Sequence, residues 1–305
     1  MRLLLVAALS CVGCSAGDDG SSESGSNGDP CTPFEASSID VGGSPGSLHY
    51  DPGLGQLHVV DDATNRIFVY GQDGQLSAFG GVPSATDGPS SDSLSELAVA
   101  ADGAIHVARY GFGDAAIGAV FRIRQGADPE RITGLAASVR RTGLVLAAEP
   151  GVIFVSAHEQ AMGGGFVGHV DRVDLAGGGE SHLVDGLSKP TGLVDFQGGL
   201  LVAEPAVGTV YRIDLAAPSS PPVAFVTGIP EADRLARAGA DAVLVTSFDA
   251  ATQTGRVIRI RPDGALAVAA EGSWYPRSVA YDPSGRIFIA TRESTQVMVV
   301  PVCPF

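Results

Sequence analysis

Short apolar runs with alternating polar positions recur along the chain at a nearly constant interval. Residues 200–215, LLVAEPAVGTVYRIDL, contain two of these runs, joined by a turn that carries Glu204 and Pro205. The first run has counterparts that begin at residues 57, 105, 153, 243 and 287, so successive starts are 48, 48, 47, 43 and 44 residues apart. Six copies of a unit of this length indicate a β-propeller or a solenoid.

Each unit contains runs with the alternation expected of β-strands. The second run of the segment above, TVYRIDL, recurs at residues 66–70, 119–123, 169–175, 256–260 and 296–300. Another run precedes each pair, and a fourth follows the pair in every unit except the last. Turn sequences such as Asp102-Gly103 separate the runs, and no stretch shows a helical period. We therefore predict an all-β fold over residues 31–305, a six-bladed β-propeller with four-stranded blades.

The last unit lacks its fourth run, and residues 37–41 form an unpaired apolar run ahead of the first unit. We predict that this N-terminal strand pairs with residues 296–300 and closes the ring, which removes the open sheet edge. Cys31 precedes one of these two strands and Cys303 follows the other. An antiparallel pairing brings those two points together, so we predict a disulfide between the two cysteines.

Residues 1–13 are interpreted as a lipoprotein signal peptide. One Arg precedes an apolar stretch that is too short to span a bilayer. The stretch ends in Cys11-Val12-Gly13-Cys14, which resembles the bacterial lipobox with Cys14 as the lipid-bearing cysteine. Cleavage before Cys11 and a plain secretory signal are the alternatives. Residues 14–30, rich in Gly, Ser and Asp, are expected to be a flexible tether, and the protein is expected to be an exported, membrane-anchored lipoprotein of the outer membrane.

The composition narrows the range of partners. The chain has 34 acidic residues against 19 Lys and Arg residues, a formal net charge of −15, and Lys189 is its single lysine. Nucleic acid and anionic lipid surfaces require clustered cations. We therefore expect no nucleic acid, and contact with a membrane only through the N-terminal lipid. A small molecule, a glycan or a protein is the expected partner of a monomeric chain.

Several units share the pattern Pro-x-Gly-Leu, a turn, (Leu/Ile)-x-Val-Ala-Glu and Gly-x-Val-(Tyr/Phe)-Arg-Ile, which is clearest over residues 189–214. Over residues 37–300 this pattern resembles the propellers of the NHL-repeat and regucalcin/gluconolactonase superfamily. The resemblance implies that ligands meet the face formed by the loops between second and third strands and between blades, called the loop face below. The least regular of these loops are residues 81–93, 109–118, 157–168 and 230–234.

Lactonase-type members of the superfamily hold a divalent cation at the axis with a Glu, two Asn and an Asp. In this chain Asn65 is the only asparagine within the predicted propeller, although Glu96 and Asp233 could occupy the two acidic positions. A hard cation requires several convergent oxygen ligands. We therefore expect neither a metal ion nor a cofactor.

Nine residues are candidates for ligand binding because the repeat places them on the loop face or at strand ends near the axis. They are Glu96, Arg109, Arg141, His158, Thr191, Glu204, Asp233, Trp274 and Arg277. The alternatives are that the charged residues pair in the channel wall or lie on a solvated rim, and that Trp274 packs at the seam that closes the ring. His158 beside Glu159 could act as a base. Ser-His-Asp and zinc-type spacings are absent, so no catalytic residue is assigned.

These observations favour a non-catalytic propeller that binds a ligand or a protein and is displayed as an exported lipoprotein. The alternatives are a metal-dependent hydrolase of the regucalcin/gluconolactonase type and a lyase-type propeller that uses His158. The hydrolase needs cation ligands that the sequence lacks, and the lyase needs a second residue to support the histidine.

Overall fold

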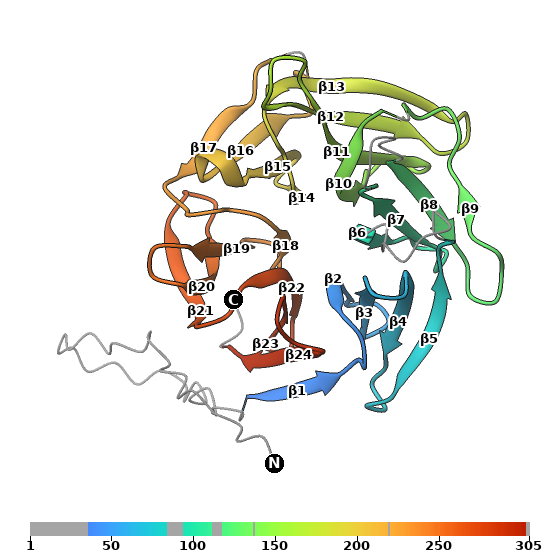
Figure 1. Cartoon of the computed structure of the whole chain (residues 1–305), viewed down its shortest axis with the longest axis vertical. Helices are drawn as coiled ribbons and strands as arrows, with labels where there is room; N and C mark the ends of the chain where they lie inside the picture. Colours follow the sequence, from blue (N-terminus) through green and yellow to red (C-terminus); the bar gives the residue numbers. More distant parts are fainter. Residues whose placement is uncertain (1–35, 84–93, 112–117, 137, 219, 303–305) are drawn as a thin grey trace, which may run out of the picture.

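The structure, a computed structural model, describes residues 36–83, 94–111, 118–136, 138–218 and 220–302 of the chain. These residues form six four-stranded antiparallel sheets arranged as a ring, which confirms the predicted six-bladed β-propeller (Figure 1). Cys14, Cys31 and Cys303 lie outside the described residues, as do the signal peptide and the tether. Within the described ranges, no helix has the length and apolar character needed to cross a membrane.

Consecutive strands form each of the first five blades, and the first strand of each blade surrounds the ring axis (Figure 1). Blade 1 consists of β2 (Pro45–Asp51), β3 (Gln56–Asp61), β4 (Arg66–Tyr70) and β5 (Leu76–Gly81). Blade 2 consists of β6 (Leu94–Val99), β7 (Ile105–Arg109), β8 (Ala119–Ile123) and β9 (Glu130–Arg131). Blade 3 consists of β10 (Arg140–Leu146), β11 (Val152–Gln160), β12 (Phe166–Asp174) and β13 (Gly179–Leu187).

The next two blades repeat this order. Blade 4 consists of β14 (Leu193–Phe196), β15 (Gly199–Glu204), β16 (Thr209–Asp214) and β17 (Val223–Thr227), with the short 3-10 helix η1 (Pro205–Val207) between β15 and β16. Blade 5 consists of β18 (Leu235–Arg237), β19 (Val243–Asp249), β20 (Thr254–Ile260) and β21 (Leu266–Gly272). The Glu-Pro segment of residues 200–215 is therefore the connection between the second and third strands of blade 4.

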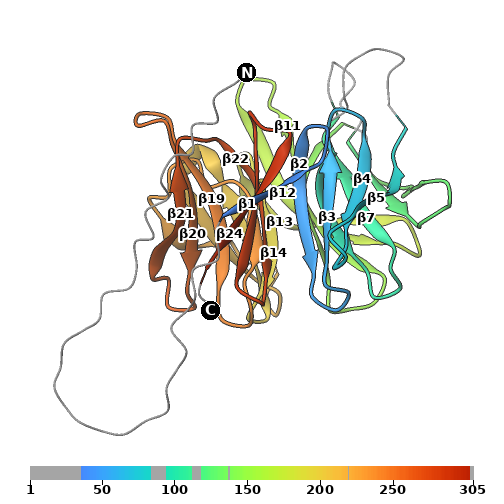
Figure 2. The same cartoon turned by 90° about the horizontal axis from the view of Figure 1, so that it is seen from below.

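Blade 6 is completed from the other end of the described chain. It consists of β22 (Pro276–Asp282), β23 (Arg286–Thr291), β24 (Gln296–Pro301) and, on the outside, β1 (Ser37–Asp40). Strand β1 pairs antiparallel with β24, with Ser37 opposite Val299 and Asp40 opposite Gln296. Figure 2 shows the blue β1 beside the red strands of this blade. The predicted closure of the ring by residues 37–41 and 296–300 is thus confirmed.

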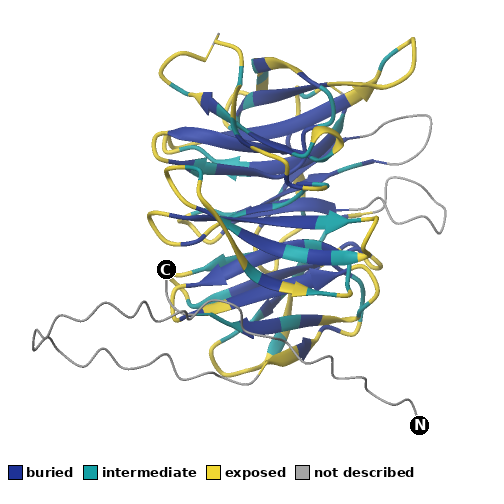
Figure 3. Cartoon of the chain, turned by 90° about the vertical axis from the view of Figure 1, so that its left-hand side faces the viewer, coloured by how far each residue is buried: buried dark blue, intermediate teal, exposed yellow. Residues whose placement is uncertain are grey.

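Alternation along the strands places apolar side chains in the seams between neighbouring blades. Among the described residues, each seam contains one cluster of buried hydrophobic side chains. In β3, Val59 packs in the seam with blade 6 and Val60 in the seam with blade 2. Both faces of a blade are therefore apolar, and exposed residues gather in the connections (Figure 3). Polar groups buried at the ends of the inner strands are exceptions to this pattern.

The connection between β11 and β12 differs from the prediction of an irregular loop over residues 157–168. That prediction is wrong, because the two strands continue as a paired ladder as far as Gln160 opposite Phe166. The glycines that suggest a loop form only the tight turn, where Gly164 and Gly165 have φ angles of 86° and 81°. Glycine adopts such angles without a steric penalty. Residues 230–234 lie outside any strand, as expected.

Candidate functional site

The candidate site lies at the ring axis, where the inner strands of the blades begin on the loop face. The inner strands of neighbouring blades contact one another all round the ring. Five charged residues at this end of the strands approach one another and are called the axial cluster. They are Asp62 after β3, Glu96 in β6, Asp233 and Arg234 before β18, and Arg277 in β22.

Arg277 and Asp62 form one ion pair of the axial cluster. Nη2 of Arg277 donates to Oδ2 of Asp62, and Nη1 donates to Oγ of Ser44 at 3.1 Å. The Asp62 side chain is 8% exposed and that of Arg277 is 26% exposed. Burial raises the pKa of the Asp62 carboxyl, although the positive charges of Arg277 and Arg234 oppose the rise. The pair joins blade 6 to blade 1 and leaves part of the guanidinium open to solvent.

Arg234 crosses the axis of the ring. Its Nη1 donates to the backbone carbonyl oxygen of Thr142 in blade 3 at 2.7 Å and lies 3.6 Å from Oε2 of Glu96 in blade 2. Its Nε lies 3.8 Å from Oδ1 of the neighbouring Asp233. The backbone N–H of Arg234 donates to Oγ1 of Thr246 at 2.9 Å, which fixes the start of blade 5. The guanidinium therefore links blade 5 to the two blades on the far side of the ring.

Glu96 is the most perturbed carboxyl of the axial cluster. Burial raises its pKa to about 8, while Arg234 opposes the rise and Asp233 adds to it. At pH 7 the protonated form is therefore favoured. Among the described residues, Oδ1 of Asp62 has no hydrogen-bond partner, and the contact that Oε2 of Glu96 makes with Nη1 of Arg234 is 3.6 Å long. One buried oxygen at the axis is thus left for a ligand or for solvent.

The chemistry of these groups does not fit a divalent cation of the lactonase type. Two guanidinium groups, those of Arg234 and Arg277, occupy the space between the carboxyl groups. The carboxyl of Glu96 is the one most easily protonated, which weakens it as a cation ligand. Asn65 is buried at the turn between β3 and β4, outside the axial cluster.

Two aromatic residues and an arginine border the axial cluster on the loop face and are called the aromatic shelf. It consists of Phe248 and Tyr275, whose ring centroids are 4.5 Å apart, and of Arg292, whose guanidinium lies 4.1 Å from the centroid of Tyr275. The hydroxyl of Tyr275 donates to Oε2 of Glu231 at 3.1 Å. Burial, followed by the charge of Glu231, raises the pKa of Tyr275 to about 12. The phenol therefore remains protonated at physiological pH.

Trp274 lies against the outer strands of blade 5 and not beside the axial cluster. Its indole lies over Gly255 and Gly272, where an added methyl group would clash with the ring. Trp274 also packs against the hydrophobic cluster between blades 5 and 6. Trp274 therefore packs at a seam, although at the one between blades 5 and 6 and not where β1 closes the ring, and a ligand contact by this residue stays a prediction.

Three other candidates make structural contacts away from the axial cluster. Arg141 is completely buried and forms a pair of hydrogen bonds with Glu180, at 2.8 and 3.0 Å, along the face of blade 3. Glu204 accepts hydrogen bonds from the backbone N–H groups of residues 188 and 189, which lead into blade 4. Arg109 donates to the carbonyl oxygen of Pro83 at 3.3 Å.

The last two candidates are also enclosed by protein. Thr191 donates from Oγ1 to the carbonyl oxygen of Asp233 at 2.9 Å, which joins blade 4 to blade 5. His158 is buried in β11, with its ring 5.7 Å from that of Tyr110 and 5.2 Å from that of Phe166. Burial lowers the pKa of His158 to about 4, and Lys189 lowers it further. The structure thus unites only Glu96, Asp233 and Arg277 of the nine candidates in the axial cluster.

Asp62 and Arg234 of the axial cluster, and Tyr275 of the aromatic shelf, were not among the nine candidates. Asp62 is the second of two consecutive aspartates in the β3–β4 turn, and the first, Asp61, is instead used to hold that turn. Arg234 could be assigned to the axis from its repeat position, but not to a particular partner. Tyr275 could be recognised only as one of two adjacent aromatic residues.

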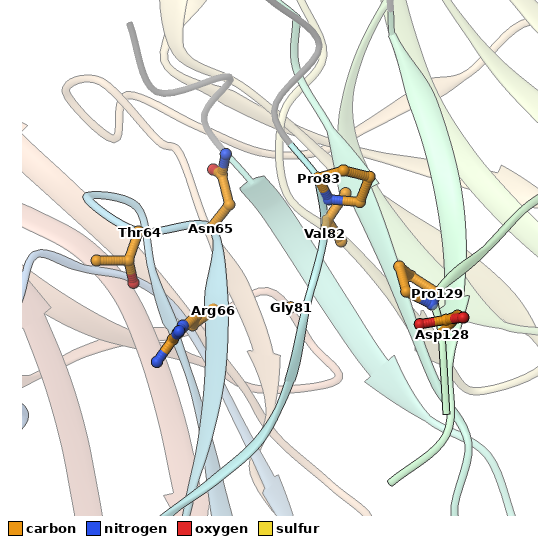
Figure 4. A pocket seen from close by; sticks show the side chains of 8 residues that line it. All are labelled: Thr64, Asn65, Arg66, Gly81, Val82, Pro83, Asp128 and Pro129. Carbon is orange, nitrogen blue, oxygen red and sulfur yellow. The ribbon is translucent and has the colours of Figure 1, made fainter. Parts of the chain in front are cut away.

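A separate depression of about 510 Å³ lies between blades 1 and 2 (Figure 4). It is lined by Thr64, Asn65, Arg66, Gly81, Val82, Pro83, Asp128 and Pro129. The side chains in Figure 4 surround an open hollow, and none belongs to the axial cluster. A ligand in this depression would therefore not contact the charged groups at the axis.

No family model matches this sequence, and no curated protein matches it either. Solved structures do resemble the fold. A structural-genomics target provisionally named a gluconolactonase is 20% identical, with a TM-score of 0.66 over 90% of this chain and 93% of that chain. The calcium-binding protein regucalcin from Agrobacterium tumefaciens is 14% identical, with a TM-score of 0.61 over 85% of this chain and 90% of that one.

A third similar structure is virginiamycin B lyase from Staphylococcus aureus. It is 12% identical, with a TM-score of 0.60 over 88% of this chain and 99% of the lyase. Likeness at these identities concerns the fold, which hosts different activities in the three proteins. The chain therefore shares the six-bladed propeller fold of gluconolactonase-like and regucalcin-like proteins.

Proposed function

We propose that the chain is a non-catalytic propeller that binds a ligand on the loop face, above the axial cluster and beside the aromatic shelf. The observation that supports this most is the position of Arg234, which spans the axis to Glu96 and to the carbonyl oxygen of Thr142. A guanidinium held across the ring forms a floor for a ligand. It also engages the carboxyl group that a hydrolase would need as an acid, a base or a cation ligand.

The chemistry of this region suits a hydroxyl-rich ligand such as a glycan fragment. The buried Oδ1 of Asp62 can accept a hydrogen bond, and the partly exposed guanidinium of Arg277 can donate one. The half-buried ring of Tyr275, in contact with Phe248 and Arg292, lies beside these groups, and aromatic rings pack against the apolar side of a sugar ring. A few polar groups next to an aromatic surface are typical of small-molecule binding sites.

The residues described here do not favour a lactonase or a lyase activity. A calcium-dependent lactonase would have to place its cation between two guanidinium groups. A lyase that used His158 would need the substrate to enter the space between the rings of Tyr110 and Phe166. Binding without turnover requires neither arrangement.

A thermal-shift screen of the full chain tests this proposal, because a ligand that binds only the folded state raises the melting temperature. The probes are oligosaccharides, peptidoglycan fragments and calcium chloride, with isothermal calorimetry on any ligand that gives a shift. We expect a saccharide to stabilise the protein and Tyr275→Ala to weaken its binding about three- to tenfold. Tyr211→Ala, on blade 4, serves as the matched control and should bind normally.

Two results would overturn the proposal. The first is calcium-dependent hydrolysis of gluconolactone that Glu96→Gln abolishes. The second is a screen in which no saccharide stabilises the chain, or in which Tyr275→Ala binds the stabilising saccharide as tightly as the wild type does.

We also propose that this propeller is displayed at a membrane through a lipid on Cys14. The lipobox-like sequence and the short apolar stretch before it support this assignment. Radiolabelled palmitate should enter the wild-type protein but not Cys14→Ser. Labelling that persists in that variant would move the anchor to Cys11, and an unlabelled wild-type protein would exclude a lipoprotein.

A further inference from the structure

A cluster of imidazole and carboxylate groups lies on the outer part of blade 3, away from the axial cluster. His169 and Asp171 alternate along β12 and therefore point to the same face of the sheet. His182 of β13 lies directly opposite Asp171 in the ladder. The irregular pairing between Gly168 and Asp171 brings Asp185, three residues further along β13, to the same place. We call these four residues the blade-3 cluster.

The groups of the blade-3 cluster are close enough to share a single ion. His169 and His182 each offer a ring nitrogen and Asp185 offers a carboxylate oxygen, and these three atoms lie within 4.8 Å of one another. The centroids of the two imidazole rings are 4.4 Å apart. Asp171 touches both imidazoles, with Oδ1 2.7 Å from Nδ1 of His182 and Oδ2 3.2 Å from Nε2 of His169. A carboxylate that contacts two histidines fixes the orientation of both rings, as the outer carboxylates of metal sites do.

The buried carboxylate of this cluster is held mainly by long contacts. The side chain of Asp171 is 0% exposed, and its Oδ2 lies 3.2 Å from Nε2 of His169 and 3.6 Å from Nη1 of Arg141. Neither contact has the geometry of a good hydrogen bond. A buried carboxylate that is satisfied in this way would be stabilised further by a cation beside it.

The cluster opens to solvent on one side. The His182 side chain is 59% exposed and Asp185 is also exposed, whereas His169 and Asp171 form the buried base. A hydrated ion can therefore reach the imidazoles without movement of the ring. We propose that the blade-3 cluster binds a divalent transition-metal ion such as Zn²⁺, with His169, His182 and Asp185 as ligands and Asp171 as the carboxylate that orients the two imidazoles.

The ligand set decides which class of ion fits. Two imidazoles with one carboxylate suit Zn²⁺, Ni²⁺ or Cu²⁺, whereas Ca²⁺ and Mg²⁺ prefer six or more oxygen ligands. Three protein ligands leave one coordination position for water or for an outside group. The site thus differs in both place and chemistry from a calcium site at the propeller axis.

The neighbouring charges are compatible with a cation, although Arg141 lies close. Nη1 of Arg141 is 3.6 Å from Oδ2 of Asp171, but the same guanidinium makes two hydrogen bonds to Glu180. Together Asp171, Asp185 and Glu180 supply three carboxylates against this one guanidinium. The excess negative charge equals the charge of a divalent ion, which would neutralise the cluster.

Titration of the full chain with zinc chloride tests the proposal. The protein is prepared without a polyhistidine tag, stripped with a chelator and followed by isothermal calorimetry. We expect saturable binding at one ion per chain, lost or weakened at least about tenfold in the double variant His182→Gln/Asp185→Asn. Both positions are exposed, so the variant should keep its fold, which circular dichroism checks. The control Glu159→Gln removes an exposed acid from the same blade and should bind zinc as the wild type does.

Cobalt chloride provides a second readout, since Co²⁺ bound by imidazole has a visible absorption spectrum that depends on its ligands. We expect this spectrum in the wild type and in Glu159→Gln, and its loss in the double variant. The proposal is overturned if the wild type binds neither ion, or if the folded double variant binds Zn²⁺ as tightly as the wild type, which would assign the ion to cysteines or to another surface.

Discussion

Glu96 should make the stability of the ring depend on pH. Burial raises its pKa from 4.5 to about 8, so the folded protein keeps a proton that the unfolded chain has already lost. The folded state binds more protons across this window, and the free energy of unfolding therefore falls as the pH rises from about 4.5 to about 8. Each pKa unit corresponds to about 1.4 kcal/mol, which gives a total loss of about 5 kcal/mol. That is a large fraction of the stability of a typical protein, roughly 5–15 kcal/mol.

Glu96→Gln isolates this effect because an amide resembles the protonated carboxyl but cannot ionise. The variant should be about as stable as the wild type at pH 5 and more stable at pH 9, by up to about 5 kcal/mol. His49, His106 and His158 titrate in the opposite sense, since burial lowers the pKa of each to about 4 and their stability contribution grows as the pH rises. These histidines are common to both proteins and cancel in the difference.

Urea unfolding between pH 5 and pH 9 measures that difference. Trp274 is the only tryptophan of the chain and is packed at the seam between blades 5 and 6, so its fluorescence reports unfolding of the ring. Glu159→Gln, at an exposed carboxyl, is the control and should follow the wild type at every pH. If the curves of wild type and Glu96→Gln run parallel across the window, Glu96 is already ionised near neutral pH, and the interpretation of the axial cluster is wrong.

Three further predictions concern the packing and closure of the ring. Arg277→Met should destabilise the fold by about 3 kcal/mol because it leaves the buried carboxyl of Asp62 without its counter-charge. Thermal unfolding measures the loss of stability, and an unchanged melting temperature would contradict the prediction. Ile39→Ala should cost about 2–4 kcal/mol, since Ile39 is buried in the seam that β1 closes, whereas Ser38→Ala at an exposed position of β1 should change little. Cys31 and Cys303 should be found in one cross-linked peptide of a non-reduced digest, and their bond should contribute about 4–5 kcal/mol in the chain-entropy estimate; two free thiols in exported material would refute the pairing.

The strands and the closure of the ring could be predicted because they depend on local patterns. Val59 and Val60, for example, are consecutive apolar residues whose side chains point to opposite faces of the sheet. Both faces must therefore be buried, and the two neighbouring blades bury them. Strand β1 was predictable for the same reason, since the last repeat lacked one strand. The extension of β11 and β12 was not, because the glycines at 163–165 favour a loop and a tight hairpin turn equally well.

The axial cluster was predictable only in part. The repeat position identifies Glu96, Asp233 and Arg277 as residues near the axis, but the direction of a long side chain depends on neighbours that are distant in the sequence. Arg141 illustrates this, since it starts at the inner strand and extends along blade 3 to Glu180. Arg234 instead extends across the ring. No local pattern distinguishes these two arginines.

The position of Arg234 also bears on how the ring folds. In an array of repeats, each unit contacts only its neighbours, so the units can in principle form and melt one at a time. Arg234 of blade 5 contacts Glu96 of blade 2 and Thr142 of blade 3, which bypasses the nearest-neighbour rule. These contacts can form only when the intervening blades are in place, and the loss of any one of those blades breaks them. A single side chain at the centre thus adds to the cooperativity of the whole ring and makes partly unwound forms with a missing blade less stable.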